Sequence, residues 1–322
     1  MGKIARFLAA LVFIPAAIFG AGVTGADILK ADAGVRALGL GSAYTAGGND
    51  VESVNFNPAG IAFVSAMDLK AYYVKNYAGS LDMEMYNITF ASPIENSFVE
   101  GSYSIEGTYR GMPSISHPEA TDPAVAYNDL LIKAVYAVNA ARLTFIPWSE
   151  SKYLNLGIAA TLVMEQIGAM SGSSVSFDLG SQFVLYDTGF KFGAVLQNAG
   201  FPFKFINETS PLPLTLRLGA SYTSRVDKDN VMMAELDYIQ DFYDYARFAI
   251  GVEDNIMDIF FLRAGYNTSI DTRNAAYASV GAGMKLKVTE ITLLLDYTFR
   301  YQFFGNFIGA QQSHLAGVGA RF

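Results

Sequence analysis

The chain has no cysteine, two histidines and one tryptophan among its 322 residues. Without cysteine, the sequence excludes disulfides, a lipoprotein anchor and any metal site or nucleophile based on a thiol. The histidines, His117 and His314, lack the spacing to acidic residues that would hold a metal ion. Ser313 precedes His314, but adjacent strand residues point to opposite faces and would not form a hydrolase pair. We therefore expect no catalytic residue, metal or cofactor.

Charged residues are also scarce, at 16% of the chain against roughly 25% in ordinary soluble domains. Hydrophobic residues make up 52%, yet after the first two dozen residues no apolar run is long enough for a helix that spans a bilayer. The net charge of −8 disfavours nucleic acid as a partner, because phosphate binding requires clustered Lys and Arg. High apolarity without a spanning helix favours a β-barrel whose outer wall faces lipid.

Long stretches of the sequence have an apolar residue at every second position. This period of two runs from Leu154 to Met164 and returns from Leu214 to Tyr222. Successive side chains of a strand point to opposite faces, so each stretch has one apolar and one polar face. The 24 phenylalanines and 19 tyrosines would supply aromatic girdles at the two membrane interfaces.

Fourteen such stretches predict an all-β protein, a closed antiparallel transmembrane barrel spanning residues 67–322. An even number of strands brings both ends of the barrel to the periplasmic side. If the first strand runs outward, the long connections Thr108–Tyr127, Ala199–Pro211 and Phe304–Ala310 are external. The predicted strands are 67–78, 82–92, 96–107, 128–142, 153–167, 173–186, 189–198, 212–225, 230–240, 245–254, 259–269, 275–288, 290–303 and 311–322.

Charged residues within the predicted strands keep to the polar face. Placing Arg or Lys on the lipid face near the midplane would cost about 2–4 kcal/mol, so the polar face must line the lumen. The predicted lumenal charges are Glu165, Asp178, Arg217, Glu235, Asp237, Arg247, Arg263, Lys285, Lys287, Asp296 and Arg300.

Both ends of the chain predict export to the outer membrane, where lipid would surround the barrel. Lys3 and Arg6 precede an apolar run, and small residues precede a plausible cleavage site before Asp27. We predict a signal peptide over residues 1–26, with a retained membrane-anchoring helix as the alternative. The chain ends in Phe322 after apolar residues at alternate positions, a pattern that resembles the assembly signal of outer-membrane barrels.

Residues 27–66 are rich in glycine and alanine and lack a sustained period of two. Their glycines do not have the spacing of a dinucleotide-binding loop. We predict a compact plug, with a short helix near Leu40–Ala46 and a turn at Asn57-Pro58 before the first strand. Arg36 and Asp50 would tie this plug to the lumen wall, and a solvated pair is the alternative.

The run from Gly34 to Gly60 ends in Asn57-Pro58-Ala59-Gly60 and resembles the N-terminal hatch motif of the FadL superfamily of outer-membrane channels. The resemblance is greatest to the PorV/PorQ branch, which includes spirochaetal FadL-like paralogues. Four more stretches fit that branch, so that the resemblance covers nearly all of the chain after the signal peptide: Leu196–Gly200, Pro211–Gly219, Arg263–Tyr266 and Gly281–Gly283.

The resemblance implies a fourteen-stranded barrel plugged by an N-terminal hatch, in agreement with the strand count obtained from alternation. Its fatty-acid channels admit a hydrophobic substrate from outside and release it through a lateral opening once the hatch moves. Its PorV-type members instead receive exported cargo for a secretion machine. The hatch and gating candidates are Arg36, Asp50, Asn55, Asn57, Pro58 and Gly60.

The external loops are shorter here than in the long-chain fatty-acid channels, which puts the elaborate capturing surface of those channels in doubt. Phe201, Phe203 and Phe205 make an apolar external loop that would contact a ligand or partner, or pack against the barrel rim or lipid. We expect passive uptake of hydrophobic or amphipathic molecules such as fatty acids, gated by the hatch. The alternatives are docking of exported cargo without conduction of solute, and a structural or surface-exposed barrel without a solute role.

Overall fold

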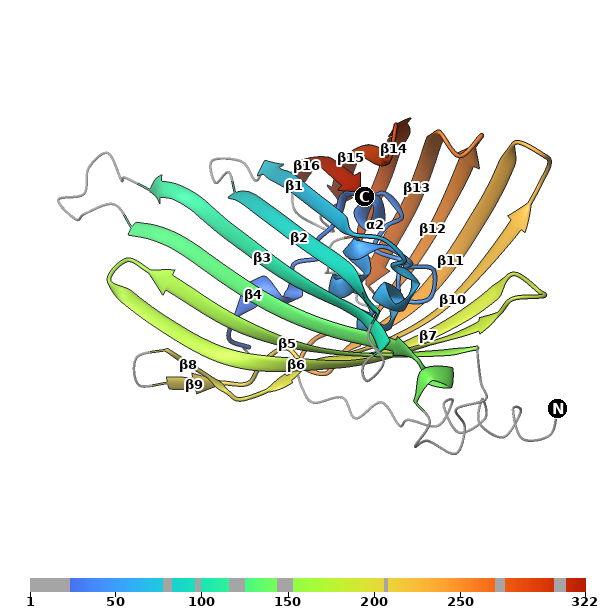
Figure 1. Ribbon diagram of the computed structural model, residues 1–322. Coiled ribbons are helices and arrows are strands. Elements are labelled where there is room, and N and C mark those ends of the chain that lie inside the picture. Colours follow the sequence, from blue (N-terminus) through green and yellow to red (C-terminus); the bar gives the residue numbers. More distant parts are fainter. Residues whose placement is uncertain are drawn as a thin grey trace.

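A computed structural model describes residues 24–77, 83–95, 100–115, 125–143, 153–205, 208–269, 276–303 and 311–322. Within these ranges the strands form one antiparallel sheet that curls into a barrel (Figure 1). The first and last strands of the chain pair with each other, and the pairing of β5 with β6 closes the sheet. The prediction of a closed fourteen-stranded antiparallel barrel is confirmed.

Two short strands add a hairpin to this wall between β7 and β10, where β8 pairs with the first residues of β6. The hairpin consists of β8 (Phe203–Phe205) and β9 (Glu208–Ser210). The fourteen wall strands are β1 (Asp68–Tyr77), β2 (Met83–Glu95), β3 (Glu100–Ile115), β4 (Val125–Asn139), β5 (Leu154–Ile167), β6 (Met170–Leu185), β7 (Phe190–Gly200), β10 (Thr215–Arg225), β11 (Asn230–Asp241), β12 (Arg247–Ile256), β13 (Phe260–Ser269), β14 (Ala276–Val288), β15 (Ile291–Phe303) and β16 (Gln311–Arg321).

The third strand is where the sequence-based bounds were wrong. β3 continues to Ile115 instead of ending near residue 107, so the predicted connection Thr108–Tyr127 was too long. Gly107 and Gly111 interrupt the apolar side of this strand and hide its alternation. The predicted loop Ala199–Pro211 contains the β8–β9 hairpin. The predicted loop 304–310, His117 and most of the predicted signal peptide, residues 1–23, lie outside the described residues.

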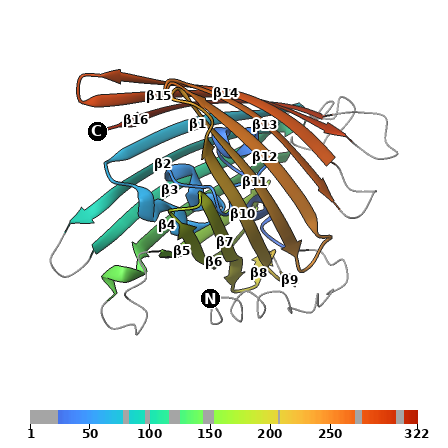
Figure 2. The same cartoon turned by 90° about the vertical axis from the view of Figure 1, so that its right-hand side faces the viewer.

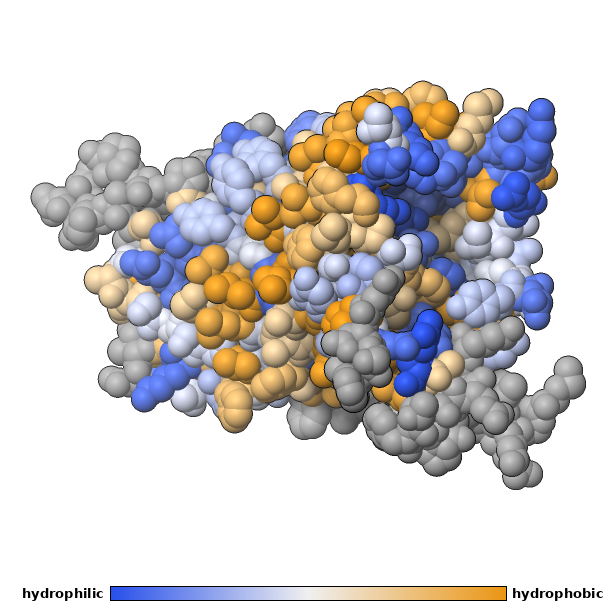
Figure 3. Space-filling model, in the orientation of Figure 1, coloured by the Kyte–Doolittle hydropathy of each residue, from blue (hydrophilic) through white to orange (hydrophobic). Residues whose placement is uncertain are grey.

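The two faces of the wall differ sharply in polarity. Ile88, Ile158 and Leu179 point outward and are 56%, 55% and 62% exposed, whereas the inward-pointing Arg217 and Asp237 are 3% and 0% exposed. Hydrophobic surface accordingly covers much of the wall in Figure 3. An apolar exterior around a charged interior is the distribution expected of a barrel surrounded by lipid.

Aromatic side chains meet near both ends of the wall. Toward one end, the Tyr86 ring lies 5.1 Å from that of Tyr73 and 6.4 Å from that of Tyr109. At the other end, the rings of Phe190 and Tyr222 lie 4.7 Å apart. Two such bands match the girdles that flank the apolar belt of membrane barrels.

Residues 24–66, here called the lumenal segment, lie inside the barrel (Figures 1 and 2). They form η1 (Asp27–Lys30), α2 (Val35–Gly39), η2 (Val51–Asn55) and η3 (Pro58–Phe63). The helix predicted near Leu40–Ala46 is absent from this described stretch, and α2 ends before it. Gly41 and Ser42 adopt φ values of 66° and 68°, a left-handed conformation that ends a helix. In the part of the chain with described structure, no helix is long and apolar enough to cross a membrane.

Candidate functional site

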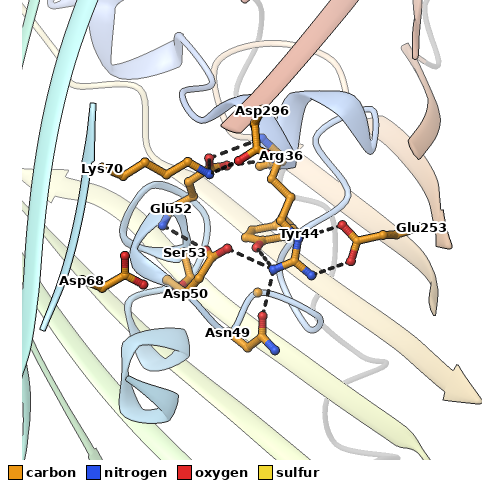
Figure 4. Close-up of polar contacts among 12 residues, drawn as sticks. Arg36, Tyr44, Asn49, Asp50, Glu52, Ser53, Asp68, Lys70, Glu253 and Asp296 are labelled. Carbon is orange, nitrogen blue, oxygen red and sulfur yellow. Dashed lines mark hydrogen bonds and ion pairs between the residues drawn. The ribbon is translucent and has the colours of Figure 1, made fainter. Parts of the chain in front are cut away.

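An alternating chain of seven charges, here called the ion-pair network, joins the lumenal segment to four wall strands. Its members are Asp50, Arg36, Glu253, Arg263, Asp296, Lys70 and Glu52. Figure 4 labels all of them except Arg263. The Arg36 guanidinium donates to Asp50 Oδ2 at 2.9 Å and to Glu253 Oε1 at 2.7 Å. Glu253 Oε2 accepts from Arg263 Nε at 2.6 Å. The segment thus reaches β12 and β13 through one arginine. Arg36 and Asp50 pair with each other, and it is Arg36 that contacts the wall.

The other half of the network returns from the wall to the segment. Arg263 Nη1 lies 2.6 Å from Asp296 Oδ1, and Lys70 Nζ lies 2.7 Å from Asp296 Oδ2. Lys70 Nζ also lies 2.5 Å from Glu52 Oε1, while Glu52 Oε2 accepts from the Ala37 amide at the start of α2. Each of these charges therefore meets an opposite charge or an amide, as buried charges require.

Burial and neighbouring charges act in opposite directions on the carboxyl groups of the segment. Burial alone would raise the pKa of Asp50, but Arg36 and Lys70 lower that pKa below its usual value. For Glu52 burial prevails over the attraction of Lys70, so the pKa of Glu52 is raised. The two carboxyls are close enough to titrate as a pair.

Wall side chains also bind the backbone of residues 44–48, which form no regular element. Asp237 Oδ2 accepts from the Tyr44 and Thr45 amides at 3.0 and 3.1 Å, and Glu235 Oε1 accepts from the Ala46 amide at 2.6 Å. On the opposite side, Gln182 Nε2 donates to the Gly48 carbonyl at 2.9 Å. These contacts satisfy backbone groups that would otherwise be buried without partners.

The remaining hatch candidates lie at the end of η2 and in η3, which packs against β3, β4, β5 and β6. Asn55 Nδ2 donates to Glu106 Oε2 at 2.8 Å. Asn57 caps η3 by accepting from the Ala59 amide at 3.1 Å, and its Nδ2 donates to the Ser181 carbonyl at 2.9 Å. Pro58 and Gly60 belong to η3, where both are buried.

Glycines of the wall allow the segment to touch the backbone of the strands. A Cβ on Gly265 would lie 2.0 Å from the Gly41 nitrogen, and one on Gly251 would lie 2.5 Å from the Leu40 oxygen. Six strands contribute such a glycine, so little space separates the segment from the wall around much of the circumference. These close-approach positions are Gly157, Gly180, Gly193, Gly219, Gly251 and Gly265.

The first residues of the segment lie in an apolar cluster near the β8–β9 hairpin. Ile28 packs there with Leu131, Val163 and Phe203. Phe203 is 2% exposed, whereas Phe201 is 66% exposed and Phe205 is partly buried. The predicted external loop therefore does not present three exposed phenylalanines, because Phe203 packs against the lumenal segment.

Nine of the eleven predicted lumenal charges lie on the inward face within the barrel. The other two, Lys285 and Lys287, lie at the end of β14, where Lys285 binds Asp258 at 2.6 Å and Lys287 is exposed.

Five of the nine bind the lumenal segment directly or through the ion-pair network, and Asp178 does so through Lys133, which donates to the Val54 carbonyl. Of the other three, Arg247 lies 4.0 Å from Asp32, Arg300 lies over the Tyr277 ring, and Glu165 stands opposite Asp129 in the register of β4 and β5. The six are Asp178, Arg217, Glu235, Asp237, Arg263 and Asp296.

A groove of about 880 Å³ lies at the end of β3–β6 beside the hairpin, on the outer face of the wall, where Tyr109 and Leu130 are 43% and 37% exposed. Tyr109, Leu130, Met164 and Ser173 line it in one cross-strand row that continues to Lys204. Because these side chains point away from the lumen, the groove is not part of the lumen.

Sequence analysis missed Glu52, Lys70 and Glu253 as members of the ion-pair network. Lys70 and Glu253 stand on the inward parity of β1 and β12, so the alternation rule would have found them. Glu52 had no such signal, because the lumenal segment has no period of two.

Two kinds of chemical site, a metal centre and a Ser–His pair, were searched for among the described residues. No group of three His, Asp or Glu side chains there could hold a metal ion. Ser313 points inward and bonds Arg300, while the His314 ring lies on the other face against Tyr297.

No protein-family model matches the chain, and no curated protein matches it significantly in sequence. Solved structures do resemble it in fold. The CymD monoaromatic hydrocarbon channel superposes with a TM-score of 0.61 at 10% identity, over 89% of this chain and 96% of that chain.

Two further solved structures give similar values. The toluene transporter TodX of P. putida gives a TM-score of 0.58 at 10% identity, over 90% of this chain and 98% of that chain. A FadL homologue of Pseudomonas aeruginosa gives 0.54 at 10% identity, over 89% and 97%. These similarities show that the chain shares its barrel fold with the three proteins.

Proposed function

We propose that this chain is an outer-membrane channel for passive uptake of small hydrophobic or amphipathic molecules, with the lumenal segment as its hatch. One observation carries the proposal: a barrel with an apolar exterior is filled by its own N-terminal segment, and the end of the lumen beside the hairpin holds an apolar cluster around Ile28.

Passive transport fits the chemistry of the described residues. A hydrophobic solute gains free energy when it leaves water for apolar surface, at roughly 25 cal/mol per Å² of apolar area. Movement into the cell then needs only a concentration gradient, without nucleotide or cofactor. The hydrocarbon channels that share this fold support the same solute class.

Gating by the hatch follows from how tightly the segment fits. Where wall glycines contact the segment backbone, no solute could pass between the two. A route through the lumen therefore requires part of the segment to move. The ion-pair network and the backbone contacts to Glu235 and Asp237 set the cost of that movement.

Uptake by whole cells tests the proposal, because the outer membrane is the barrier in question. The full chain would be expressed in a Gram-negative host that lacks its own fatty-acid channel, and uptake of radiolabelled dodecanoate and toluene would be measured. We expect faster uptake than in cells with empty vector, and a changed rate after deletion of Asp32–Gly60. A folded barrel in the outer membrane without any gain in uptake would contradict the proposal and favour cargo docking.

A further inference from the structure

The residues just before the cleavage site that the sequence predicts are packed inside the barrel. Gly25 donates its amide to the Pro211 carbonyl, beside the β8–β9 hairpin, at 3.0 Å. Ala26 is 1% exposed and belongs to the apolar cluster near that hairpin. A cut before Asp27 would remove all of these contacts from the mature protein.

Ala26 also closes the first turn of η1. Its carbonyl accepts from the Leu29 amide at 2.9 Å, and its own backbone has a φ of 56°. A non-glycine residue keeps this left-handed conformation only where its surroundings hold it, because the conformation is strained. A cut after Ala26 would remove both the acceptor of the Leu29 amide and a side chain of the apolar cluster.

Gly25 fits closely against the hairpin. A Cβ on Gly25 would lie 2.6 Å from the Phe203 Cβ, so the two residues are in direct contact. On its other side the Phe203 ring meets Gly172 of β6, where an added Cβ would lie 2.7 Å from the ring. Phe203 of β8 is therefore held between the barrel wall and the first described residues of the lumenal segment.

The sequence by itself allows more than one cleavage site. A signal peptide is cut after small residues at the first and third positions before the bond. Ala26 and Thr24 meet this requirement for a cut before Asp27, and Gly22 and Gly20 meet it four residues earlier. Both pairs follow the apolar run of the signal peptide, so the packing of the residues between the two sites has to distinguish them.

We propose that the precursor is cut between Gly22 and Val23, and that the retained residues Gly25 and Ala26 hold the β8–β9 hairpin against the lumenal segment. The hydrogen bond to Pro211 and the contact with Phe203 then belong to the mature protein. Export by a signal peptide is presupposed, whereas the solute that the channel carries has no bearing on the cut.

The N-terminus of the mature chain tests the cut directly. The full precursor would be expressed in a Gram-negative host, and the protein purified from the outer membrane would be examined by intact-mass measurement and N-terminal sequencing. We expect the first residue to be Val23. A chain that begins at Asp27 would overturn the proposal, and an uncut chain would overturn both the proposal and the predicted signal peptide.

Two leucine variants separate the two sites without requiring a folded barrel, because processing precedes assembly. In a pulse-chase experiment Gly22→Leu should lose processing and accumulate as the precursor, since a large side chain at the last position before the bond is not accepted. Ala26→Leu is the matched control and should be processed at the rate of the unchanged protein. The reverse pattern would place the cut before Asp27 and contradict the proposal.

Gly25→Ala tests the contact with the hairpin and leaves small residues at both candidate cleavage sites. The new Cβ would overlap Phe203, so the hairpin should be displaced and trypsin should cut after Lys204 faster than in the unchanged protein. Gly107→Ala is the matched control, because its Cβ would lie 3.9 Å from the nearest atom. Equal cleavage of the two variants would show that the retained residues do not hold the hairpin.

Discussion

The lumenal segment has two regions that are held in different ways. Residues 35–63, the inner region, are bound by the ion-pair network, by carboxylates on backbone amides and by contacts with wall glycines. Residues 24–32, the leading region, depend mainly on the burial of Ile28 and on ion pairs of Asp27 and Asp32 that are 3.2 Å or longer.

The difference indicates which part of a hatch can move. Displacement of the inner region would expose charges and amides that no apolar solute could compensate. Displacement of the leading region costs mainly apolar contact around Ile28, which a hydrophobic solute could replace. We therefore expect the leading region to move in transport while the inner region stays in place.

The largest effect should come from Glu253→Gln. The change leaves Arg36 and Arg263 without their shared carboxylate inside the lumen, and breaking a buried ion pair costs about 3–5 kcal/mol. We expect a lower free energy of unfolding in urea, read from the mobility difference between folded and unfolded barrel on gels. An unchanged midpoint would mean that the network does not hold the inner region.

Amide hydrogen exchange compares the two regions without a mutation. Tyr44, Thr45 and Ala46 donate their amides to buried carboxylates, whereas residues 24–32 have few such bonds. We expect amides of the inner region to exchange at least about a hundredfold more slowly, since exchange follows the cost of local opening. Equal protection, measured by mass spectrometry of the protein in detergent, would remove the distinction between the regions.

Gly265→Ala should disturb the inner region by steric contact alone. The new Cβ would lie 2.0 Å from the Gly41 nitrogen, and such overpacking costs about 1–3 kcal/mol. We expect proteolysis to cut the inner region faster in this variant. Gly107→Ala is the matched control, because the nearest atom to its Cβ lies 3.9 Å away. Equal cleavage of the two variants would contradict the close fit.

Asp27→Asn should have the smallest effect. Its carboxylate lies 3.7 Å from Arg110 and is 68% exposed, and exposed ion pairs contribute about 0–1 kcal/mol. The urea midpoint should therefore stay close to that of the unchanged protein. A loss as large as that of Glu253→Gln would show that the leading region is held as firmly as the inner one.

Alternation in the sequence was sufficient to predict most of the wall. Charges such as Arg217 and Asp237 fixed which side of each strand faces inward, because their transfer to lipid is costly. The prediction was poorer where glycine removes the signal, as at Gly107 and Gly111 in β3. The resemblance to the PorV/PorQ branch, the signal peptide and the residue roles remain predictions.

The site could be predicted only in part. Arg36 and the inward charges were found, since charged residues in an apolar chain need partners. The pairing of these charges could not be predicted from the sequence, because partners such as Arg36 and Glu253 are 217 residues apart in the chain. The helix predicted near Leu40 was misplaced, because no period of two or of 3.6 marks the lumenal segment.

The sequence alone determined the barrel, its strand number and its inward face, because a strand in lipid must alternate and a charge must avoid lipid. Only the tertiary structure decided how the N-terminal residues fill the lumen. That packing depends on contacts between distant residues, such as Lys70 with Glu52 and Asp296, and on glycines whose missing side chains leave space. Such contacts form in three dimensions and leave no periodic pattern in the chain.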